Sequence, residues 1–365
     1  MRRRRARRPA GARAAPARNW TARLPGAPGM DLIQRGRMEF RELARLNGGY
    51  VESRILHAAV TVELFDALDA SGRSGEEIAA AIGTNPRATT LLLNALVAMR
   101  LVRKRGDHFL ETDASRTFLT TGSPTSYTGM VRFDASLWPL WERLADTVRS
   151  GEPARAPDMF QATPAETARF IDAMASLVQA RGDARVLAET LDLAAARRLL
   201  DVGSGPGSFP IEFCRRHPNL EVTIFDLPAT LEVTRRHLAE AGFDGRIRLV
   251  AGDYRRDALP TGFDVAFLSN IVHGEDEATN RALMRNVHAA LAPGGRVLIK
   301  DHVTDESGTS PAAAAVFSIA MLLFARGRDY AYGEIRAWLL EAGFSRVGVD
   351  VLPPGLISTM VTGYK

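Results

Sequence analysis

The stretch Leu199–Gly207, which reads LLDVGSGPG, constrains the fold of this chain more than any other. Leu199–Val202 is a short apolar run that predicts a buried strand, and the glycine-rich turn after it leads into a helical pattern. Glycine at alternate positions permits positive φ angles and lets a ligand approach the main chain, while the next helix offers unpaired N–H groups. A strand, a glycine turn and a helix in this order are typical of a nucleoside-binding βαβ unit.

The turn lacks the features of a phosphate-binding loop. Ser208 stands where the dinucleotide fingerprint G-x-G-x-x-G requires its third glycine. The turn contains no Lys or Arg, and no Gly-Lys-Ser/Thr sequence follows it. We therefore expect a ligand whose binding does not depend on a phosphate group.

The next two predicted strands each bring an acid to the same edge of the sheet. Leu220–Asp226 ends in Asp226, nineteen residues after Gly207, where a carboxylate can hydrogen-bond a ribose diol. Ile247–Ala251 is followed closely by Asp253. Because ligands of open α/β sheets bind at the carboxyl ends of the strands, the glycine turn and both acids form one predicted site. The arrangement resembles the class I methyltransferases, and this resemblance implies S-adenosyl-L-methionine as the cofactor, an adenosine with a sulfonium cation and no phosphate.

The net charge and the cysteine content indicate which partners this chain can bind and in which cellular compartment it is expected. The 365 residues carry a formal net charge of +5, but residues 1–30 contain nine Arg and no acid, which leaves the remainder at −4. We expect this tail to be disordered, and either to bind polyanions loosely or to precede a start at Met30 or Met38. The single cysteine, Cys214, allows no internal disulfide and favours the cytoplasm. The apolar run Pro311–Ala325 is shorter than the roughly twenty residues of a transmembrane helix.

The first half of the chain, residues 31–185, is predicted to be mainly helical with one small hairpin. A helical pattern from about 31 to 70 precedes a capping box at Ser74–Glu77, and a further helix is expected to open at Asn85. Leu101–Thr112 predicts a hairpin, so the outline is that of a winged helix, which in many proteins reads DNA. The helix before the hairpin is nearly all apolar, which favours packing against a partner, and we expect a homodimer. A DNA-binding regulator is the alternative from another functional class.

The second half, residues 186–365, supplies the rest of the sheet. Phe263–Ser269 and Arg296–Asp301 predict a fourth and a fifth strand. The segments 345–351 and 356–364 are typical of a closing hairpin. Parallel strands that alternate with helices and end in such a hairpin predict an α/β, Rossmann-like, doubly wound sheet of seven strands.

A histidine and two acids follow these strands. His273 stands just past the carboxyl end of the fourth strand, a position that favours a catalytic role. Asp301 ends the fifth strand, and strand alternation predicts that His302 points to the opposite side. Asp329 is expected in the loop before the last helix.

Taken in order, these segments resemble a narrower family. A winged-helix dimerisation region followed by LLDVGSGPG, FDLP, AGD, SNIVH, ALAPGGRVLIKD and EAGF is similar to the small-molecule O-methyltransferases related to caffeate and acetylserotonin methyltransferases, over roughly residues 40–365. The resemblance implies that the cofactor is bound by Gly203, Gly205, Asp226, Leu227, Asp253, Tyr254 and Ser269. It implies a general base at His273, with flanking acids at Asp301 and Asp329. It also implies an acceptor pocket that includes Phe170, Met174, Asn270, Met321 and Phe324.

The expected function is methyl transfer from S-adenosylmethionine to a phenol or enol hydroxyl of a flat apolar molecule, in secondary metabolism and with no metal ion. The sequence departs from the family pattern at two places. Gly274-Glu275 follows His273 where many relatives have Asp-Trp, which affects the positioning of the acceptor, and Ser269 replaces the Lys of plant relatives, which weakens one cofactor contact. Chemical alternatives are C-methylation, hydroxylation or a pericyclic reaction with the cofactor bound. The presence of His273 favours transfer to oxygen.

Overall fold

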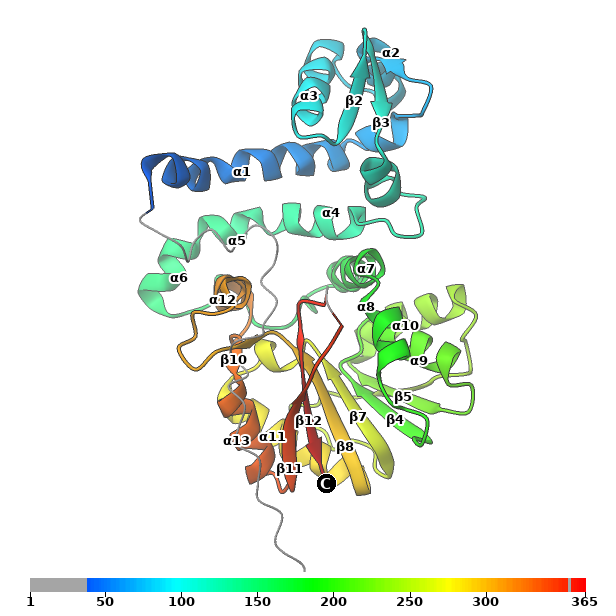
Figure 1. The fold of residues 1–365 in the computed structure, drawn as a ribbon, viewed down its shortest axis with the longest axis vertical. Helices are drawn as coiled ribbons and strands as arrows, with labels where there is room; N and C mark the ends of the chain where they lie inside the picture. Colours follow the sequence, from blue (N-terminus) through cyan, green and yellow to red (C-terminus); the bar gives the residue numbers. More distant parts are fainter. Residues whose placement is uncertain (1–37, 354–355) are drawn as a thin grey trace, which may run out of the picture.

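The computed structural model describes residues 38–353 and 356–365, so the Arg-rich segment 1–30 lies outside the described residues. A smaller N-terminal unit stands above a larger α/β unit, and a layer of helices lies between them (Figure 1). The larger unit contains the seven-stranded sheet that the sequence predicts.

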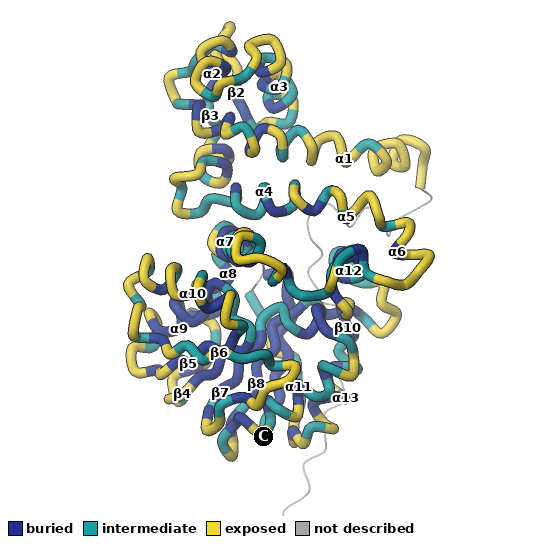
Figure 2. The backbone as a smooth tube through the Cα atoms, turned by 180° about the vertical axis from the view of Figure 1, so that it is seen from behind, coloured by how far each residue is buried: buried dark blue, intermediate teal, exposed yellow. Residues whose placement is uncertain are grey.

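The sheet has the strand order β11-β12-β8-β7-β4-β5-β6. Its strands are β4 (Arg198–Val202), β5 (Glu221–Asp226), β6 (Arg248–Ala251), β7 (Phe263–Ser269), β8 (Leu291–Asp301), β11 (Arg346–Asp350) and β12 (Thr359–Tyr364). All neighbours are parallel except β12, which runs antiparallel to both β8 and β11. The central strands are almost continuously apolar because helices cover both of their faces, and they form the buried centre of the unit (Figure 2).

The chain order places a crevice above β4 and β7. From β4 the chain proceeds outward to β5 and β6, and it then returns to β7 on the other side of β4. The connections that leave β4 and β7 therefore diverge, and such a switch point is where open α/β sheets bind their ligands.

Five helices cover the two faces of the sheet (Figure 1). One face packs against α8 (Asp183–Thr190), α9 (Ser208–Arg216) and α10 (Pro228–Glu240), and the other against α11 (Glu277–Ala290) and α13 (Tyr332–Glu341). The domain boundary expected between residues 185 and 186 falls inside α8. The division of the chain into domains stays a prediction.

The N-terminal unit has the expected order of helices and hairpin. Its elements are α1 (Phe40–Thr61), the 3-10 turn η3 (Leu64–Ala67), β1 (Arg73–Ser74), α2 (Gly75–Ile82), α3 (Pro86–Ala98), β2 (Val102–Arg105) and β3 (His108–Glu111). The predicted capping box is confirmed, since Ser74 and Glu77 exchange side-chain and backbone hydrogen bonds, and Asn85 caps the next helix by accepting from the Ala88 N–H. The assignment of this unit as a winged helix stays a prediction.

The three basic side chains of the hairpin are held within this unit. Arg103 donates to the carbonyl oxygen of Glu111, Lys104 to the side chain of Asn94, and Arg105 to the carbonyl oxygen of Ser71. The three acceptors are neutral and the three side chains are exposed, so these hydrogen bonds fix the positions of the side chains without neutralising their charge.

Further helices form the layer between the units and cover the carboxyl edge of the sheet. They are α4 (Thr128–Ser136), α5 (Trp138–Glu142), α6 (Leu144–Ser150), α7 (Pro164–Arg181) and α12 (Ala312–Phe324). The π-helical turn η4 (Ser115–Leu119) packs against η3 in the N-terminal unit. Two short strands, β9 (Val303–Thr304) and β10 (Tyr330–Ala331), pair beside α12. Across residues 38–353 and 356–365, none of the helices combines the length and hydropathy needed to cross a bilayer.

Candidate active site

The glycine turn after β4 has the positive φ angles that its sequence predicts. Gly203 and Gly205 have φ angles of +70° and +59°, which L side chains rarely adopt. A Cβ atom at Gly203 would also lie 2.4 Å from Cδ1 of Ile271, so a side chain there would force Ile271 to move. The turn is thereby held close to the segment that follows β7.

Asp226 connects this turn to the end of β5. Its carboxylate accepts hydrogen bonds from the Gly205 N–H at 2.8 Å and from the Leu227 N–H at 2.7 Å. Burial raises the pKa of Asp226 to about 6, and the two backbone donors offset part of this effect. At neutral pH the carboxylate is charged and retains lone pairs for a further donor, such as a ribose hydroxyl.

A narrow cavity of about 70 Å³ lies above the turn. It is lined by Met159, Gln161, Phe170, Ile171, Gly203, Gly205, Asp226, Leu227, Thr230, Asp253, Tyr254, Arg255 and Ile271. Six of the seven predicted cofactor residues are in this group, whereas Ser269 is not, and its buried hydroxyl has no hydrogen-bond partner among the described residues. Phe170, predicted for the acceptor pocket, lines this cavity as well. Ligand pockets ordinarily have about 300–1,000 Å³, so side chains of this lining must move aside for a nucleoside to enter.

The charges at this cavity fit a cofactor without phosphate. Arg255 is the one basic side chain of the lining, and its Nε donates to Asp253 at 2.8 Å. This pairing keeps the pKa of Asp253 below its ordinary value although burial alone would raise it. The lining therefore combines carboxylates, backbone groups and apolar side chains, which suits an adenosine with a positive sulfonium group.

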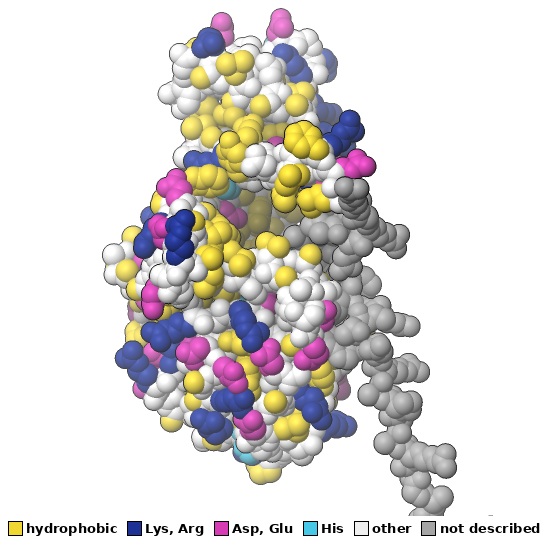
Figure 3. All heavy atoms as spheres, turned by 90° about the vertical axis from the view of Figure 1, so that its left-hand side faces the viewer, with side chains coloured by type: hydrophobic (Ala, Val, Ile, Leu, Met, Phe, Trp, Pro, Cys, Tyr) yellow, Lys and Arg dark blue, Asp and Glu magenta, His cyan; other side chains and the backbone are white. Residues whose placement is uncertain are grey.

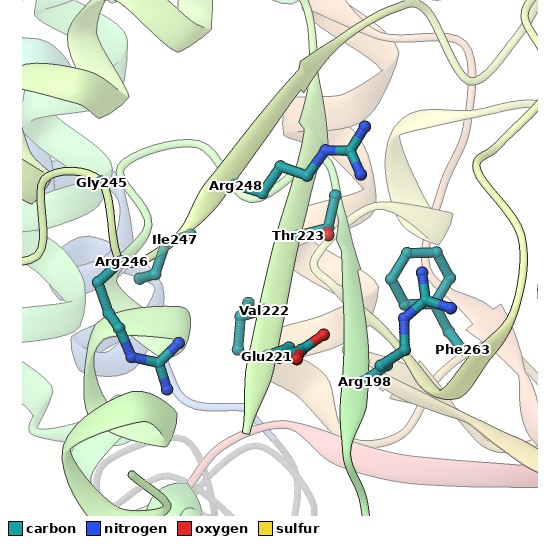
Figure 4. A pocket seen from close by; sticks show the side chains of 9 residues that line it. All are labelled: Arg198, Glu221, Val222, Thr223, Gly245, Arg246, Ile247, Arg248 and Phe263. Atoms are coloured by element: carbon teal, nitrogen blue, oxygen red, sulfur yellow. The ribbon is translucent and has the colours of Figure 1, made fainter. Parts of the chain in front are cut away.

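A larger cavity, about 450 Å³, lies at the opposite edge of the sheet, by the amino ends of β4, β5 and β6 (Figure 4). Arg198, Arg246 and Arg248 lie around it together with Glu221 (Figure 4). Arg198 donates to a backbone carbonyl oxygen, and Arg246 donates to two. Arg198 and Arg246 therefore hold neighbouring loops together. The candidate active site is the smaller cavity at the carboxyl edge of the sheet, because open α/β sheets bind their ligands at that edge.

His273 lies on a 3-10 turn, η5 (Val272–Gly274), just past the end of β7. Its Nδ1 lies 2.6 Å from Oδ1 of Asp301, while Oδ2 of Asp301 accepts from the Val272 N–H at 2.9 Å. Burial alone would lower the pKa of His273, but Asp301 and, more weakly, Asp329 raise it above its ordinary value. The same ion pair holds the pKa of Asp301 below its ordinary value against the effect of burial. The ring nitrogen Nε2 of His273 has no hydrogen-bond partner within the described part of the chain.

The expectation for His302 is wrong. Its ring stacks against that of His273 with centroids 5.8 Å apart, on the same side as Asp301. The reason is that β8 ends at Asp301, so the alternation of a strand no longer governs the next side chain. Burial lowers the pKa of His302 to about 4, and the charge of His273 adds to this effect.

Asp329 reaches the same place from the loop after α12. Its side chain is fully buried, and Oδ2 lies 3.8 Å from Nδ1 of His302. Neither carboxylate oxygen has a hydrogen-bond partner among the residues that the structure describes, and burial raises the pKa of Asp329 to about 7. The two acids predicted to flank His273 are thus both near it, but only Asp301 contacts its ring.

Aromatic side chains connect His273 with the cofactor cavity. Phe317 packs edge-on against both His273 and His302, at 5.2 and 4.8 Å between ring centroids. Phe160 stacks on Phe170 at 5.0 Å and contacts Phe324 at 5.4 Å. Between the two units the surface is hollowed, and hydrophobic side chains gather on the walls of the hollow (Figure 3).

Four of the five residues predicted for the acceptor pocket belong to two adjoining apolar clusters. Phe170, Met174 and Phe324 pack in one cluster, and Met321 packs with Phe324 in the adjoining one. Asn270 does not join them: its backbone has a left-handed φ of 58°, and its N–H donates to the carbonyl oxygen of Lys300.

Several residues of the site were not found by the sequence analysis. Phe317 carries no local signal, and His302 and Glu275 were noted in the sequence without being assigned to the site. Their roles depend on contacts across the fold; Glu275, for example, accepts a hydrogen bond from the Tyr254 hydroxyl at 2.7 Å. Asp201 did carry a signal, as an acid within an apolar strand. It is 1% exposed beneath the glycine turn, neither of its carboxylate oxygens has a partner in the described chain, and burial raises its pKa to about 7.

The fold and the site together define a class of protein. A seven-stranded sheet of this order, with a glycine turn and two acids at its carboxyl edge, is the class I methyltransferase fold. Comparison with known proteins narrows the class: an O-methyltransferase domain model matches residues 141–345, and an O-methyltransferase dimerisation domain model matches residues 44–121. The chain belongs to the S-adenosylmethionine-dependent O-methyltransferase family.

Individual relatives are similar over nearly their whole length. The 3-hydroxy-5-methyl-1-naphthoate 3-O-methyltransferase of Streptomyces sahachiroi is 35% identical over 332 residues, which cover 88% of this chain and 94% of the relative. The acetylserotonin O-methyltransferase of Mus musculus molossinus is 34% identical over 340 residues, 87% of each chain. The crystal structure of human N-acetylserotonin methyltransferase in complex with S-adenosylmethionine matches with a TM-score of 0.81 at 26% identity, and covers 91% of this chain and 99% of that one.

Proposed function

We propose that this enzyme methylates a phenol or enol hydroxyl of a flat, apolar acceptor, with His273 as the general base. The observation that carries the proposal is the 2.6 Å contact between Nδ1 of His273 and Asp301. A carboxylate at Nδ1 favours the tautomer with the proton on that nitrogen, which leaves the lone pair of Nε2 free to accept a proton.

The cofactor supplies an electrophilic methyl group on a positive sulfonium. His273 takes the proton of the acceptor hydroxyl as the oxygen attacks, and the charge of Asp301 stabilises the imidazolium that forms. General-base assistance contributes on the order of 10²–10⁴ in rate, whereas alignment of acceptor and methyl group contributes roughly 7–11 kcal/mol. Alignment of the cofactor and the acceptor therefore lowers the activation free energy more than general-base assistance does.

The residues proposed to hold the cofactor act through hydrogen bonds and shape. Asp226 accepts from the ribose hydroxyls, the turn at Gly203 and Gly205 lets the nucleoside approach the backbone, and Asp253 and Tyr254 border the base. Leu227 and Ser269 complete the proposed set. Asp329 is proposed to act on His273 through its charge and not through contact.

The acceptor class is proposed from the apolar clusters around Phe170 and Phe324. Phe160, Phe170 and Phe324 pack against one another at centroid distances of 5.0–5.4 Å, and the two half-buried rings, Phe170 and Phe324, offer apolar surface that suits an aromatic ring system. The relative from Streptomyces sahachiroi is named for a naphthoate, a bicyclic aromatic acid that carries a hydroxyl. We take hydroxylated bicyclic or polycyclic aromatics, as made in bacterial secondary metabolism, as the acceptors to test first.

We also propose a cytoplasmic homodimer that forms through the N-terminal unit. The match of residues 44–121 to an O-methyltransferase dimerisation domain supports this proposal. So does α1, whose large apolar residues are exposed along one side, with Phe40 83% and Leu46 61% exposed. The compartment is proposed from the single cysteine, Cys214, which is buried.

The test compares His273→Ala with the parent enzyme. Labelled S-adenosylmethionine is supplied with a panel of naphthols and hydroxylated polycyclic aromatics, and the product is identified by mass spectrometry so that methylation is distinguished from hydroxylation. We expect His273→Ala to lower kcat by roughly 10²–10⁴, while calorimetry shows little change in cofactor affinity.

The matched control is His108→Ala, which removes an exposed histidine at the start of β3. It should leave kcat and the cofactor affinity unchanged. Full activity of His273→Ala on a phenol would contradict the base assignment. A product without an added methyl group would contradict the proposed transfer to this acceptor class.

A further inference from the structure

Three metal-binding side chains meet beside η5. His273, His302 and Asp329 each present one ligand atom, and these atoms all lie within 4.8 Å of one another. The three residues come from η5, from the position after β8 and from the loop after α12, so their sequence spacing gives no sign of the group. Among the described residues, this is the one group of three or more His, Cys, Asp or Glu side chains with such an arrangement.

Two of the three side chains carry buried polar atoms that form no hydrogen bond among the described residues. Asp329 is 2% exposed and neither of its carboxylate oxygens has a hydrogen-bond partner in the described part of the protein. Nδ1 of His302 is buried and lacks a partner there as well. Leaving a buried polar group unpaired is unfavourable, so the fold retains these groups against a penalty that a bound ligand would remove.

The geometry around His273 suits a metal ligand. Its Nδ1 faces Asp301 at 2.6 Å, which leaves Nε2 as the free donor, and a carboxylate on the far nitrogen is the usual support of a metal-bound histidine. A metal ion bonds such donors at about 2.0–2.2 Å, so donors around one ion are at most roughly 4.4 Å apart. The observed ligand atoms lie within 4.8 Å of one another, so they would have to close by a few tenths of an ångström around an ion.

We propose that His273, His302 and Asp329 bind a divalent transition-metal ion of the Zn²⁺ type. Two imidazoles and one carboxylate are ligands for Zn²⁺, Co²⁺ or Ni²⁺, whereas Mg²⁺ and Ca²⁺ select oxygen ligands. Three protein ligands leave at least one open coordination position for water or an acceptor oxygen.

Binding of the ion and proton abstraction compete for the same nitrogen. Because the ion occupies Nε2 of His273, we expect Zn²⁺ to inhibit methyl transfer and a chelator to restore it. This consequence rests on the proposed function of His273, whereas the binding of the ion does not.

The experiment measures ion binding in the absence of cofactor and acceptor. Full-length protein is freed of metal with a chelator and titrated with Zn²⁺ by calorimetry and with Co²⁺ by visible absorption, which reports low-symmetry coordination. We expect one ion per chain, a loss of at least about tenfold in affinity in His302→Ala and in Asp329→Asn, and a loss of roughly 10–100-fold in Asp301→Asn. His302→Gln replaces His302→Ala if the latter does not fold.

The control variant is His237→Ala, which removes a histidine on α10 whose Nε2 lies 2.8 Å from Oδ1 of Asp172 on α7, and which should bind the ion normally. Equal Zn²⁺ binding in the parent, His302→Ala and Asp329→Asn would overturn the proposal, as would no binding at about 0.1 mM Zn²⁺. Specific binding without inhibition would support the ion site and contradict His273 as the base, so the two proposals fail separately.

Discussion

At the scale of single residues, the carboxylate of Asp301 organises the candidate active site. It accepts hydrogen bonds from the His273 ring, from the backbone N–H of Val272 and, at 2.8 Å, from the backbone N–H of His302. Because its pKa lies below the ordinary value, Asp301 is charged at neutral pH. One buried charge therefore sets both the tautomer of His273 and the shape of the turn that carries it.

Asp226 gives a prediction for the pH dependence of cofactor affinity. Its pKa is raised to about 6, so the carboxylate is charged above pH 6 and takes up a proton as the pH falls through that value. A charged acceptor forms stronger hydrogen bonds than a neutral one. We expect the calorimetric Kd of S-adenosylmethionine to be nearly constant above pH 7 and to rise about tenfold between pH 7 and 5. Asp226→Asn should bind weakly at all these pH values; the same pH profile in this variant would exclude Asp226 as the titrating group.

At the scale of elements, η5 and the loop after α12 are held together by hydrogen bonds to backbone carbonyl oxygens. The N–H of Arg326 donates to the carbonyl oxygen of Gly274 at 3.2 Å, and the Tyr330 hydroxyl donates to that of Glu275 at 2.7 Å. The side-chain amide of Asn280, on α11, donates to the carbonyl oxygen of Val272. These contacts keep the loop that carries Asp329 against the turn that carries His273.

Gly327 is the position at which this packing is most sensitive. A Cβ atom there would lie 2.3 Å from the carbonyl oxygen of His273 and 2.4 Å from that of Glu275, and backbone atoms cannot rotate away. We expect Gly327→Ala to lower the free energy of unfolding by about 1–3 kcal/mol and to reduce kcat more than cofactor affinity. Gly122→Ala is the matched control, since a Cβ at Gly122 meets nothing within 4 Å, and it should change stability by less than about 0.5 kcal/mol. An active, fully stable Gly327→Ala enzyme would show that η5 and the loop after α12 are free to separate.

At the scale of the whole molecule, the two units have different surfaces. The α/β unit buries its sheet between helices, whereas α1 exposes most of its length (Figure 2). Phe40, Leu43, Leu46 and Tyr50 recur at intervals of three and four, so they share one side of α1, and all four are more than half exposed. An apolar stripe of this kind is typical of an interface with a second chain.

If α1 forms the dimer interface, a charge placed on its apolar side should halve the mass of the particle in solution. We expect Leu46→Asp to convert a dimer to a monomer in light scattering at micromolar concentration, because a buried unpaired carboxylate costs several kcal/mol. Arg45→Asp introduces the same acid on the opposite side of α1 and should remain a dimer. If the parent protein is a monomer, or if Leu46→Asp is still a dimer, α1 is not the interface.

The sequence by itself determined the features that depend on short segments. Gly203, Gly205, Asp226 and Asp253 were assigned to one site because each follows a recognisable strand, and parallel strands end at the same edge of a sheet. The seven strands, the capping box at Ser74 and the position of His273 after β7 depend on periodicity and turn chemistry in the same way. Local patterns are sufficient for such features because neighbours in the sequence determine them.

Only the tertiary structure decided which side chains meet. His302 was expected on the opposite side and lies against His273, because the chain leaves the strand at Asp301 and strand alternation ends there. Phe317 joins the site through the packing of α12, and Asp329 reaches it because Gly327 allows a close backbone contact. These contacts join segments far apart in the chain, and their geometry depends on how whole elements pack, which no local pattern records.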